Sequence, residues 1–264
     1  MQNKPLIFVS NDDGFDAPGL EALVRVAREF GDVKVVAPEN PMSGVGHSVT
    51  SREPLRIKMI EREDGYERYA CSGTPVDCVK LGEQTILKRK PDLMVSGINH
   101  GSNAAVNIFY SGTMAAALES AIGGVPSIGF SLMNFRLDAD FSICDAYVRT
   151  IIQKVMEKGM PRGICLNVNI PSIPQEEIRG IKICRQARSK WVEDYEKRID
   201  PSKNEYYWLR GKFELMDEGR DTDDWALRNN FVSVVPVHFD FTAHHALDAL
   251  SAWEMDAVKE KQRT

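Results

Sequence analysis

The sequence lacks a long apolar run and an excess of basic residues. Its first apolar stretch covers only residues 6–9 and is followed by acids, whereas a membrane helix needs roughly 20 apolar residues. We therefore expect neither a secretion signal nor a membrane span at this end. The formal net charge is -5, so no broad cationic surface is expected for polymeric nucleic acid or for a membrane. A phosphate ligand would then depend on a metal ion or on backbone N–H groups.

The chain also lacks the cysteine spacing of a zinc or redox motif. Its five cysteines form an odd set without a Cys-x-x-Cys pair, and four of them lie inside apolar runs. Buried free thiols in a reducing compartment explain this pattern better than disulfides do. We therefore expect a cytoplasmic protein. Internal repeats and low-complexity linkers are absent as well, which favours a compact fold.

An alternation of strand and helix patterns is present over the first 170 residues. Residues 6–9, an amphipathic helix over 20–30 and a strand over 33–36 form a β-α-β unit. Further strands are predicted at about 55–60, 66–71, 92–96, 125–130 and 164–170, and helices at 74–87, 113–122 and 141–157. Strands separated by helices of this length predict an α/β fold with a mostly parallel, doubly wound sheet in three αβα layers.

The alternation breaks after residue 171. A short strand pattern at 181–184 leads into a polar, aromatic segment at 191–208 and then into acids at 217–224. We interpret this region as an extension outside the main sheet, followed by a late strand at 231–239 and a terminal helix at 243–259. The prediction is one functional unit, with a Rossmann-like catalytic core over 1–180 and an extension over 181–264 that makes oligomer contacts.

Polar residues follow three of the predicted strands, where open parallel sheets bind their ligands. Asp12 and Asp13 follow the first strand, and two adjacent carboxylates repel each other unless a cation or a shared proton relieves them. The alternative, that one acid caps the next helix and the other is solvated, is about equally favoured by these two residues alone. The pair therefore indicates a divalent metal without establishing one.

The segments that follow two further predicted strands add neutral oxygen donors; we call all three segments strand tips. Ser43 lies in a glycine loop after the second strand, and Asn99 follows the strand at 92–96. Hydroxyl and amide oxygens suit magnesium or manganese, although serine and asparagine beside glycine are more often simple turn residues. His47 and His100 lie in the same loops and are weak candidates for proton transfer.

The stretch from Tyr110 to Ala117 predicts a loop that leads into a helix with hydroxyl groups at its start. Free N–H groups and the positive end of the helix dipole would hold a phosphate there. The alternative is ordinary N-capping by Ser111 or Thr113. An oxygen-ligated metal beside an anion-binding helix start is what phosphoryl transfer requires.

Four linked segments resemble the SurE survival-protein family. They are Ser10 to Gly14 with Ala17-Pro18-Gly19, Ala37-Pro38 to Thr50, Gly73 to Lys80, and Ser96 to Asn103 with Tyr110 to Glu119. The likeness spans about the first 130 residues in order, so four separate chance matches are implausible. The later segment is less similar, because Asn229-Asn230-Phe231 stands where glycine and tyrosine are usual.

The resemblance implies a Rossmann-like, metal-dependent phosphatase that acts on nucleoside 5′- and 3′-monophosphates and in some cases on short polyphosphate. It implies one Mg²⁺ or Mn²⁺ per subunit, and dimers or tetramers with exchanged C-terminal segments. It implies the metal ligands Asp12, Asp13, Ser43 and Asn99, of which Asp12 and Asp13 are also catalytic. The implied phosphate- or substrate-binding residues are Asn11, Gly44, Asn103, Ser111, Gly112 and Thr113.

Two mechanisms and two rival functions stay open. Water could attack the phosphorus directly, or Asp12 could form an aspartyl-phosphate that water later hydrolyses. A signalling receiver also has paired acids after its first strand, but it should be about half as long and carry a lysine after its fifth strand, where Ser131 to Asn134 stand here. A dinucleotide-binding oxidoreductase would need G-x-G-x-x-G in the first turn, where this chain has two acids that would repel a pyrophosphate. A non-catalytic nucleotide sensor stays open only if the purified protein shows no metal-stimulated hydrolysis.

Overall fold

Residues 6–171 form a mostly parallel α/β sheet and its helices in the computed structural model, which describes residues 4–136 and 138–253. β1 (Leu6–Ser10), α1 (Pro18–Ala27) and β2 (Asp32–Pro38) form the predicted β-α-β unit, because β1 and β2 pair in parallel. Then follow β3 (Ile57–Glu63), β4 (Tyr66–Cys71), α2 (Pro75–Leu81), a π-helical turn (Gly82–Ile86), β5 (Leu93–His100), the 3₁₀ segment η2 (Ala105–Tyr110), α3 (Gly112–Ile122), β6 (Ser127–Met133), a 3₁₀ turn (Ser142–Cys144), α4 (Asp145–Lys158) and β7 (Ile164–Pro171).

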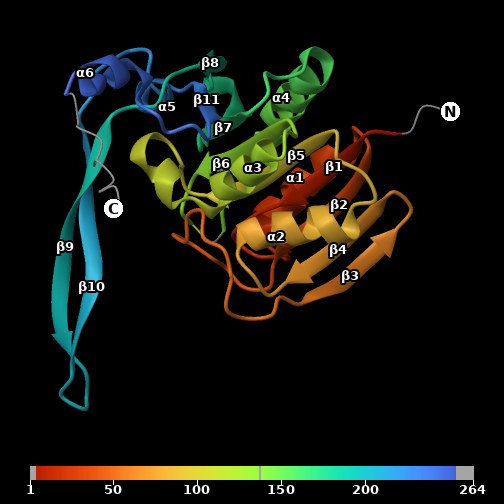
Figure 1. Cartoon of the computed structure of the whole chain (residues 1–264), viewed down its shortest axis with the longest axis horizontal. Coiled ribbons are helices and arrows are strands. Elements are labelled where there is room, and N and C mark those ends of the chain that lie inside the picture. Colours follow the sequence, from red (N-terminus) through yellow and green to blue (C-terminus); the bar gives the residue numbers. More distant parts are fainter. Residues whose placement is uncertain (1–3, 137, 254–264) are drawn as a thin grey trace, which may run out of the picture.

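Helices cover both faces of this sheet, as Figure 1 shows. Alternate residues of β1 face opposite sides: Ile7 and Val9 pack in the core under α1 and α4, and Leu6 and Phe8 pack in the core under α2 and α3. Burial of apolar side chains on both faces is what a doubly wound sheet requires. The predicted three-layer αβα architecture is therefore confirmed.

The main sheet has nine strands in the order β3-β4-β2-β1-β5-β6-β7-β11-β8. The last two are β11 (Val232–His238), which pairs antiparallel with β7, and β8 (Ile181–Ile183), which pairs in parallel with β11. The late strand is confirmed, but the interpretation of the 181–184 strand as lying outside the main sheet was wrong. The start of β11 is buried and gains a second hydrogen-bonded neighbour from β8.

The third predicted loop is also partly strand. The pairing of β5 with β6 is irregular after Ser96. It resumes at Asn99, which lies opposite Ser131, so β5 extends to His100. Gly97 lies at this irregularity with φ 117, and a Cβ there would lie 2.3 Å from the Phe130 carbonyl oxygen. Only glycine fits this backbone, so the glycine marks a bulge within the strand rather than its end.

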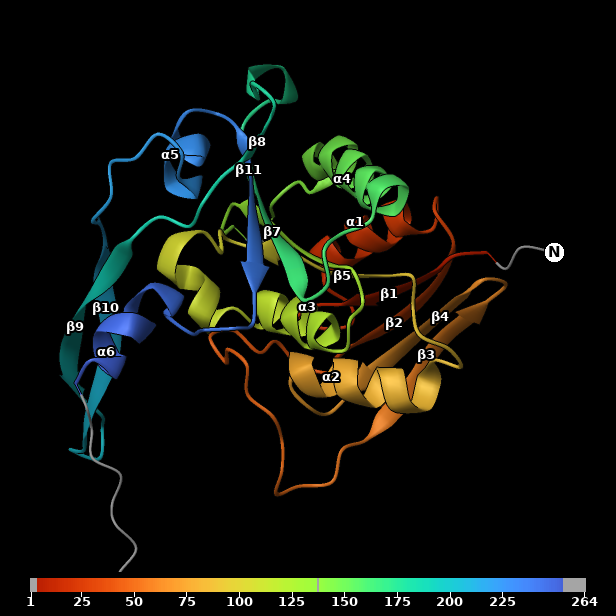
Figure 2. The same cartoon turned by 45° about the horizontal axis from the view of Figure 1, so that its top comes forward.

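The part of the chain that follows β8 in sequence and precedes β11 forms a long antiparallel arm, which projects from the main sheet. It consists of β9 (Ser189–Ile199) and β10 (Glu205–Leu215), which form a separate two-stranded sheet that projects beyond the main sheet (Figures 1 and 2). The prediction of an extension outside the main sheet is confirmed for this segment. Large side chains on the arm are exposed, among them Trp191, Tyr195, Tyr207, Trp208 and Leu209.

The last described residues form shorter helices than predicted. After α5 (Asp223–Arg228), residues 244–246 form a 3₁₀ turn and α6 (Leu247–Ser251) follows. One helix over 243–259 was therefore wrong for its described part, because the Trp253 N–H donates to Leu250 in a tight turn instead of continuing α6. Residues 254–259 of that prediction lie outside the described part of the chain.

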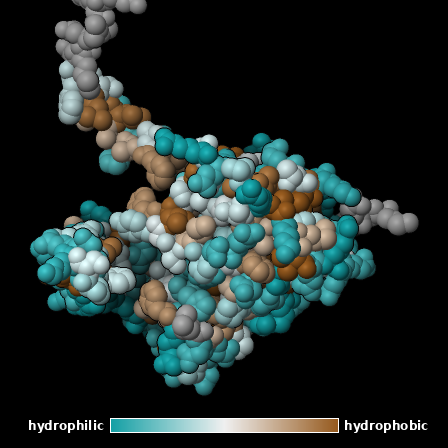
Figure 3. Space-filling view, turned by 90° about the horizontal axis from the view of Figure 1, so that it is seen from below, coloured by the Kyte–Doolittle hydropathy of each residue, from teal (hydrophilic) through white to brown (hydrophobic). Residues whose placement is uncertain are grey.

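None of the helices in the described ranges combines the length and the apolarity that crossing a bilayer requires. In the space-filling view, brown apolar patches are separated by hydrophilic surface on the face shown in Figure 3.

Candidate active site

The three predicted strand tips meet at one edge of the sheet. The Met42 N–H, from the loop after β2, donates to the Asp12 carbonyl oxygen at 2.7 Å. The His100 N–H, at the end of β5, donates to Asp13 Oδ2 at 3.2 Å. The loops after β1, β2 and β5 are thus hydrogen-bonded to one another, as the parallel order of these strands requires.

Asp12 is buried between the end of β1 and the start of α3. Its Oδ1 accepts a short hydrogen bond from the Thr113 hydroxyl, and a Cβ on Gly112 would lie 2.6 Å from the Asp12 Cβ. The absence of a side chain at Gly112 therefore lets the helix approach this carboxyl closely. Burial, and then the neighbouring charge of Asp13, raise the pKa of Asp12 to about 6, although the hydrogen bonds from Thr113 oppose this shift.

Asn99 presents its amide oxygen as a free acceptor. Its Nδ2 donates to the carbonyl oxygens of His100 at 3.0 Å and of Gly101 at 2.8 Å, so both amide hydrogens are engaged. Ser43 lies exposed in the loop that Met42 fastens to Asp12. Ser43 and Asn99 thus lie on the two segments that are hydrogen-bonded to the loop of Asp12 and Asp13.

This donor set fits a hard divalent cation. In the described residues, no group of three or more His, Cys, Asp or Glu side chains could hold a metal ion, so Asp12 and Asp13 would need neutral donors, such as the Ser43 hydroxyl and the Asn99 amide oxygen, to complete a cation site. Within the described ranges, the buried Oδ1 of Asn11, the residue before Asp12, has no hydrogen-bond partner. Repelling carboxylates and an unpaired buried oxygen at one strand end are what a cation would relieve.

The start of α3 points at Asp12. Ser111 caps the helix, since its hydroxyl accepts the Met114 N–H at 3.0 Å; the predicted N-capping is therefore observed. The hydroxyl and N–H of Thr113 both favour the charged form of Asp12. The helix start thus holds Asp12 in place. A phosphate bound next to this carboxyl would also be close to the first N–H groups of the helix.

The remaining predicted substrate residues lie around these elements. Asn11 donates its Nδ2 to the Gly14 carbonyl oxygen at 2.9 Å. Gly44 is exposed with φ 74, and nothing lies within 4 Å of a Cβ added there. Asn103 is buried and donates its Nδ2 to Ser131 Oγ at 2.9 Å, so its amide nitrogen faces the sheet.

His47 and His100 have different surroundings. His47 Nε2 lies 2.9 Å from Glu119 Oε2, and Lys80 Nζ lies 2.5 Å from Glu119 Oε1. Burial alone would raise the pKa of Glu119, but hydrogen bonds and charges from Lys80 and His47 outweigh it and lower the pKa. His100 packs edge-on against Phe141, with its Nδ1 3.5 Å from Asp13 Oδ2. His100 is thus the histidine that adjoins the paired acids.

A cavity of about 740 Å³ lies along α3, and His47 and Ser111 are among its lining residues. Asp12, Asp13, Ser43 and Asn99 do not line it. The adjacent acids Asp12 and Asp13 lie at the strand tips and not in this mostly apolar space, so the tips are the candidate active site.

Sequence reasoning missed a buried polar network that joins β7 to the loop after β5. Asn169 Oδ1 accepts the Asn103 N–H at 2.8 Å, Asn167 Nδ2 donates to the Asn103 carbonyl oxygen at 2.9 Å, and Asn169 donates to Asn167. The signal was available, since asparagine occupies alternate positions of the buried strand β7. Polar groups on one face of a buried strand need partners, and here they fix the loop after β5.

The chain is similar to known proteins over nearly its whole length. The family model described as "Survival protein SurE" matches residues 7–193. The chain is 53% identical to the 5'-nucleotidase SurE of Christiangramia forsetii over 97% of this chain and 99% of that protein. It is 44% identical to the 5'-nucleotidase SurE of Bacteroides fragilis, over 97% of this chain and 100% of that protein. The crystal structure of the SurE protein from Aquifex aeolicus has a TM-score of 0.81 and 40% identity, with 95% of this chain and 100% of that chain covered.

Proposed function

Because this chain belongs to the survival protein SurE family, we propose that it is a metal-dependent phosphomonoesterase that hydrolyses nucleoside 5′-monophosphates to nucleoside and phosphate. The observation that carries the proposal is the position of Asp12, a buried carboxylate between the paired acid Asp13 and the start of α3. Near-full-length relatives named 5'-nucleotidase SurE support the same activity. They also favour it over the receiver and dinucleotide-binding alternatives.

The site would hold one divalent cation, Mg²⁺ or Mn²⁺, through Asp12, Asp13, Ser43 and Asn99. A bound cation of this kind neutralises charge on a phosphoryl group and favours its transfer. The protein contributes the fixed geometry: Thr113 orients Asp12, and the Nδ2 bonds of Asn99 turn its oxygen away from the backbone carbonyls. Pre-oriented groups of this type lose little free energy to reorganisation during the reaction.

The phosphate would lie beside the first turn of α3, at Ser111, Gly112 and Thr113, with Asn11, Gly44 and Asn103 nearby. Helix N–H groups stabilise negative charge without a basic side chain, which suits a chain with a net charge of -5. Both routes to products use Asp12, either as a ligand while water attacks or as the nucleophile. Brief reaction with radiolabelled nucleotide distinguishes them, because only the second route leaves label on the protein.

The direct test is a substrate panel. Purified protein with Mg²⁺, Mn²⁺ or a chelator is given 5′- and 3′-nucleoside monophosphates and short polyphosphate, and inorganic phosphate is measured. We expect metal-stimulated release from 5′-monophosphates, with activity on 3′-monophosphates and polyphosphate as further proposals. A lack of release from every nucleotide with either metal would refute the proposed function.

We also propose a cytoplasmic homodimer or homotetramer with exchanged C-terminal segments. The five cysteines are all free and buried, as expected in a reducing compartment. The arm supports assembly, because an isolated two-stranded hairpin is marginally stable in water and this one exposes several aromatic side chains. Neither polymeric nucleic acid nor a membrane is proposed as a partner.

A further inference from the structure

Asp223, at the start of α5, is a charged residue with no exposure to solvent. Its Oδ2 accepts the Ala105 N–H at 2.8 Å, and its Oδ1 accepts the N–H groups of Ala187 at 2.9 Å and Asp224 at 2.8 Å. Burial raises the pKa of this carboxyl, and the three donors oppose that shift. One buried carboxylate therefore connects two segments that are far apart in the sequence.

The first of these segments leads into the candidate active site. Ala105 has φ 54, a left-handed conformation that residues with a side chain rarely adopt. It is held on both sides, since Asp223 accepts its N–H and Gln186 Nε2 donates to its carbonyl oxygen at 2.9 Å. Ala105 opens η2, and η2 ends directly before Ser111, the N-cap of α3. Whatever fixes Ala105 also fixes the path of the chain into the helix start.

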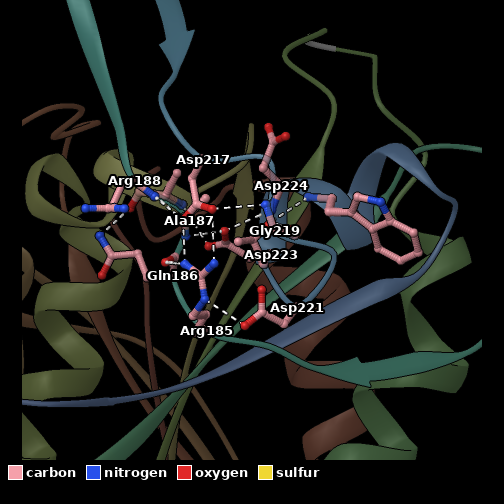
Figure 4. A network of polar contacts seen from close by, with 12 residues as sticks. Arg185, Gln186, Ala187, Arg188, Asp217, Gly219, Asp221, Asp223 and Asp224 are labelled. Carbon is pink, nitrogen blue, oxygen red and sulfur yellow. Dashed lines mark hydrogen bonds and ion pairs between the residues drawn. The ribbon is translucent and has the colours of Figure 1, made fainter.

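The second segment is the root of the arm, defined here as residues 185–191. Two more contacts join it to η2: Ser189 Oγ accepts the Val106 N–H at 3.1 Å, and Trp191 Nε1 donates to Asn107 Oδ1 at 2.8 Å. Figure 4 shows the polar network around this root. The root is therefore hydrogen-bonded to each of the first three residues of η2.

The root is also hydrogen-bonded to the segment that follows β10 and leads into α5. Arg185 donates to Asp221 Oδ2 at 2.8 Å and to both oxygens of Asp217, and its carbonyl oxygen accepts the Asp223 N–H at 3.0 Å (Figure 4). These bonds close the base of the hairpin but do not reach η2. Asp223 is the member of this group of acids whose carboxylate bonds to both the root and η2.

We propose that Asp223 is a positioning residue of the phosphatase site, which fixes Ala105 and so holds the start of α3 against Asp12. The inference rests on the proposed function for its kinetic readout. Thr113 is the second residue of α3 and bonds to Asp12, so displacement of η2 moves the groups that orient this carboxyl. Small displacements of such groups lower turnover strongly.

The test compares Asp223→Asn with Asp221→Asn in the full-length protein. Asparagine has the size of aspartate, but its NH₂ group replaces one carboxylate oxygen. That group cannot accept a hydrogen bond from an N–H donor, so at least one of the bonds to Asp223 is lost. Asp221 is the matched control, because it is exposed and its carboxylate bonds to Arg185 alone. We expect Asp223→Asn to lower kcat for a nucleoside monophosphate by about tenfold to a hundredfold, and Asp221→Asn to change it less than about twofold.

A second readout separates positioning from general damage. Hydrogen exchange followed by mass spectrometry should show faster exchange over residues 105–113 in Asp223→Asn, with β1 and β2 as protected as in the wild type. Binding of Mn²⁺ alone should weaken by less than kcat falls, since Asp13 and Asn99, unlike Asp12, are hydrogen-bonded at the end of β5 and not to the start of α3. A merely structural role would instead loosen the sheet and weaken Mn²⁺ binding together.

Gln186→Ala provides a variant for the case that Asp223→Asn fails to fold, because Gln186 is half-buried and its side chain donates to the Ala105 carbonyl oxygen, on the other side of Ala105 from Asp223. The same changes are expected, at about threefold in kcat. Normal kcat or unchanged exchange over 105–113 in a folded variant overturns the role of Asp223. A wild type that hydrolyses no nucleotide refutes the proposed function instead, so the two failures are distinguishable.

Discussion

The strand-tip site and the arm differ in how their side chains are held. At the tips, Asp12 is buried and bonded to Thr113, whereas on the arm Tyr207 and Trp208 extend into solvent. In the first region the candidate residues are held by hydrogen bonds within one chain. The second has apolar surface without a neighbour in the described residues. Chemistry is therefore expected to depend on the tips, and assembly on the arm.

The largest effect should follow from Asp12→Asn. The substitution removes the carboxylate at the centre of the site, so kcat should fall by about a thousandfold or more on either route. Phosphate release and circular dichroism are the measurements. Asp64→Asn, in the exposed turn between β3 and β4, is the control and should behave as wild type. An Asp12→Asn variant with near-normal turnover would show that the strand tips are not the catalytic region.

A smaller effect is expected from Asp13→Asn on metal binding. Loss of one carboxylate should weaken the binding of Mn²⁺ by about tenfold to a hundredfold, as measured by calorimetry on protein freed of metal. Part of the lost activity should return at high Mn²⁺, because Asp12 and Asn99 remain in place. Equal Mn²⁺ affinity for variant and wild type would remove Asp13 from the proposed ligand set.

Substitution of Glu119, which lies beside the candidate site, should have a modest, pH-dependent effect on the free energy of unfolding. Its pKa in the folded state lies below the usual 4.5, so its ion pairs stabilise the fold above about pH 4.5 and this contribution is lost as the pH falls below that value. Glu119→Gln should cost about 1 kcal/mol at pH 7 and less at pH 3.5, as measured by urea denaturation. Glu157→Gln, in an exposed ion pair on α4, should cost less at both pH values. A pH-independent cost for Glu119→Gln would contradict this account.

The smallest catalytic effect is expected on the arm. Trp208→Ser with Leu209→Ser removes two exposed apolar side chains, which are 57% and 64% exposed. If the arm joins subunits, light scattering should show a smaller assembly, while kcat per chain changes less than about twofold. An unchanged molar mass would argue against the arm as an assembly surface, and a collapse in kcat would break the division between the two regions.

The sequence predicted the candidate site best where its residues lie at strand ends. Asp12 and Asn99 lie at the ends of the first and fifth strands and Thr113 begins a helix, so chain order alone predicts their common edge. It gave no role for Asp223, whose partners Ala105 and Ala187 are brought near only by the fold. It also misplaced the 181–184 strand, because edge pairing with β11 depends on the whole sheet rather than on local pattern.

The pairing of β11 with β7 bears on how far the chain can be shortened. A boundary between residues 180 and 181 stays a prediction, but the main sheet runs across it. Protein truncated at residue 180 would leave the backbone of β7 as an open edge, next to the buried side chains of Val168 and Ile170. Such an edge is a template for aggregation, so the catalytic half is expected to need its own C-terminal strand to remain dispersed in solution.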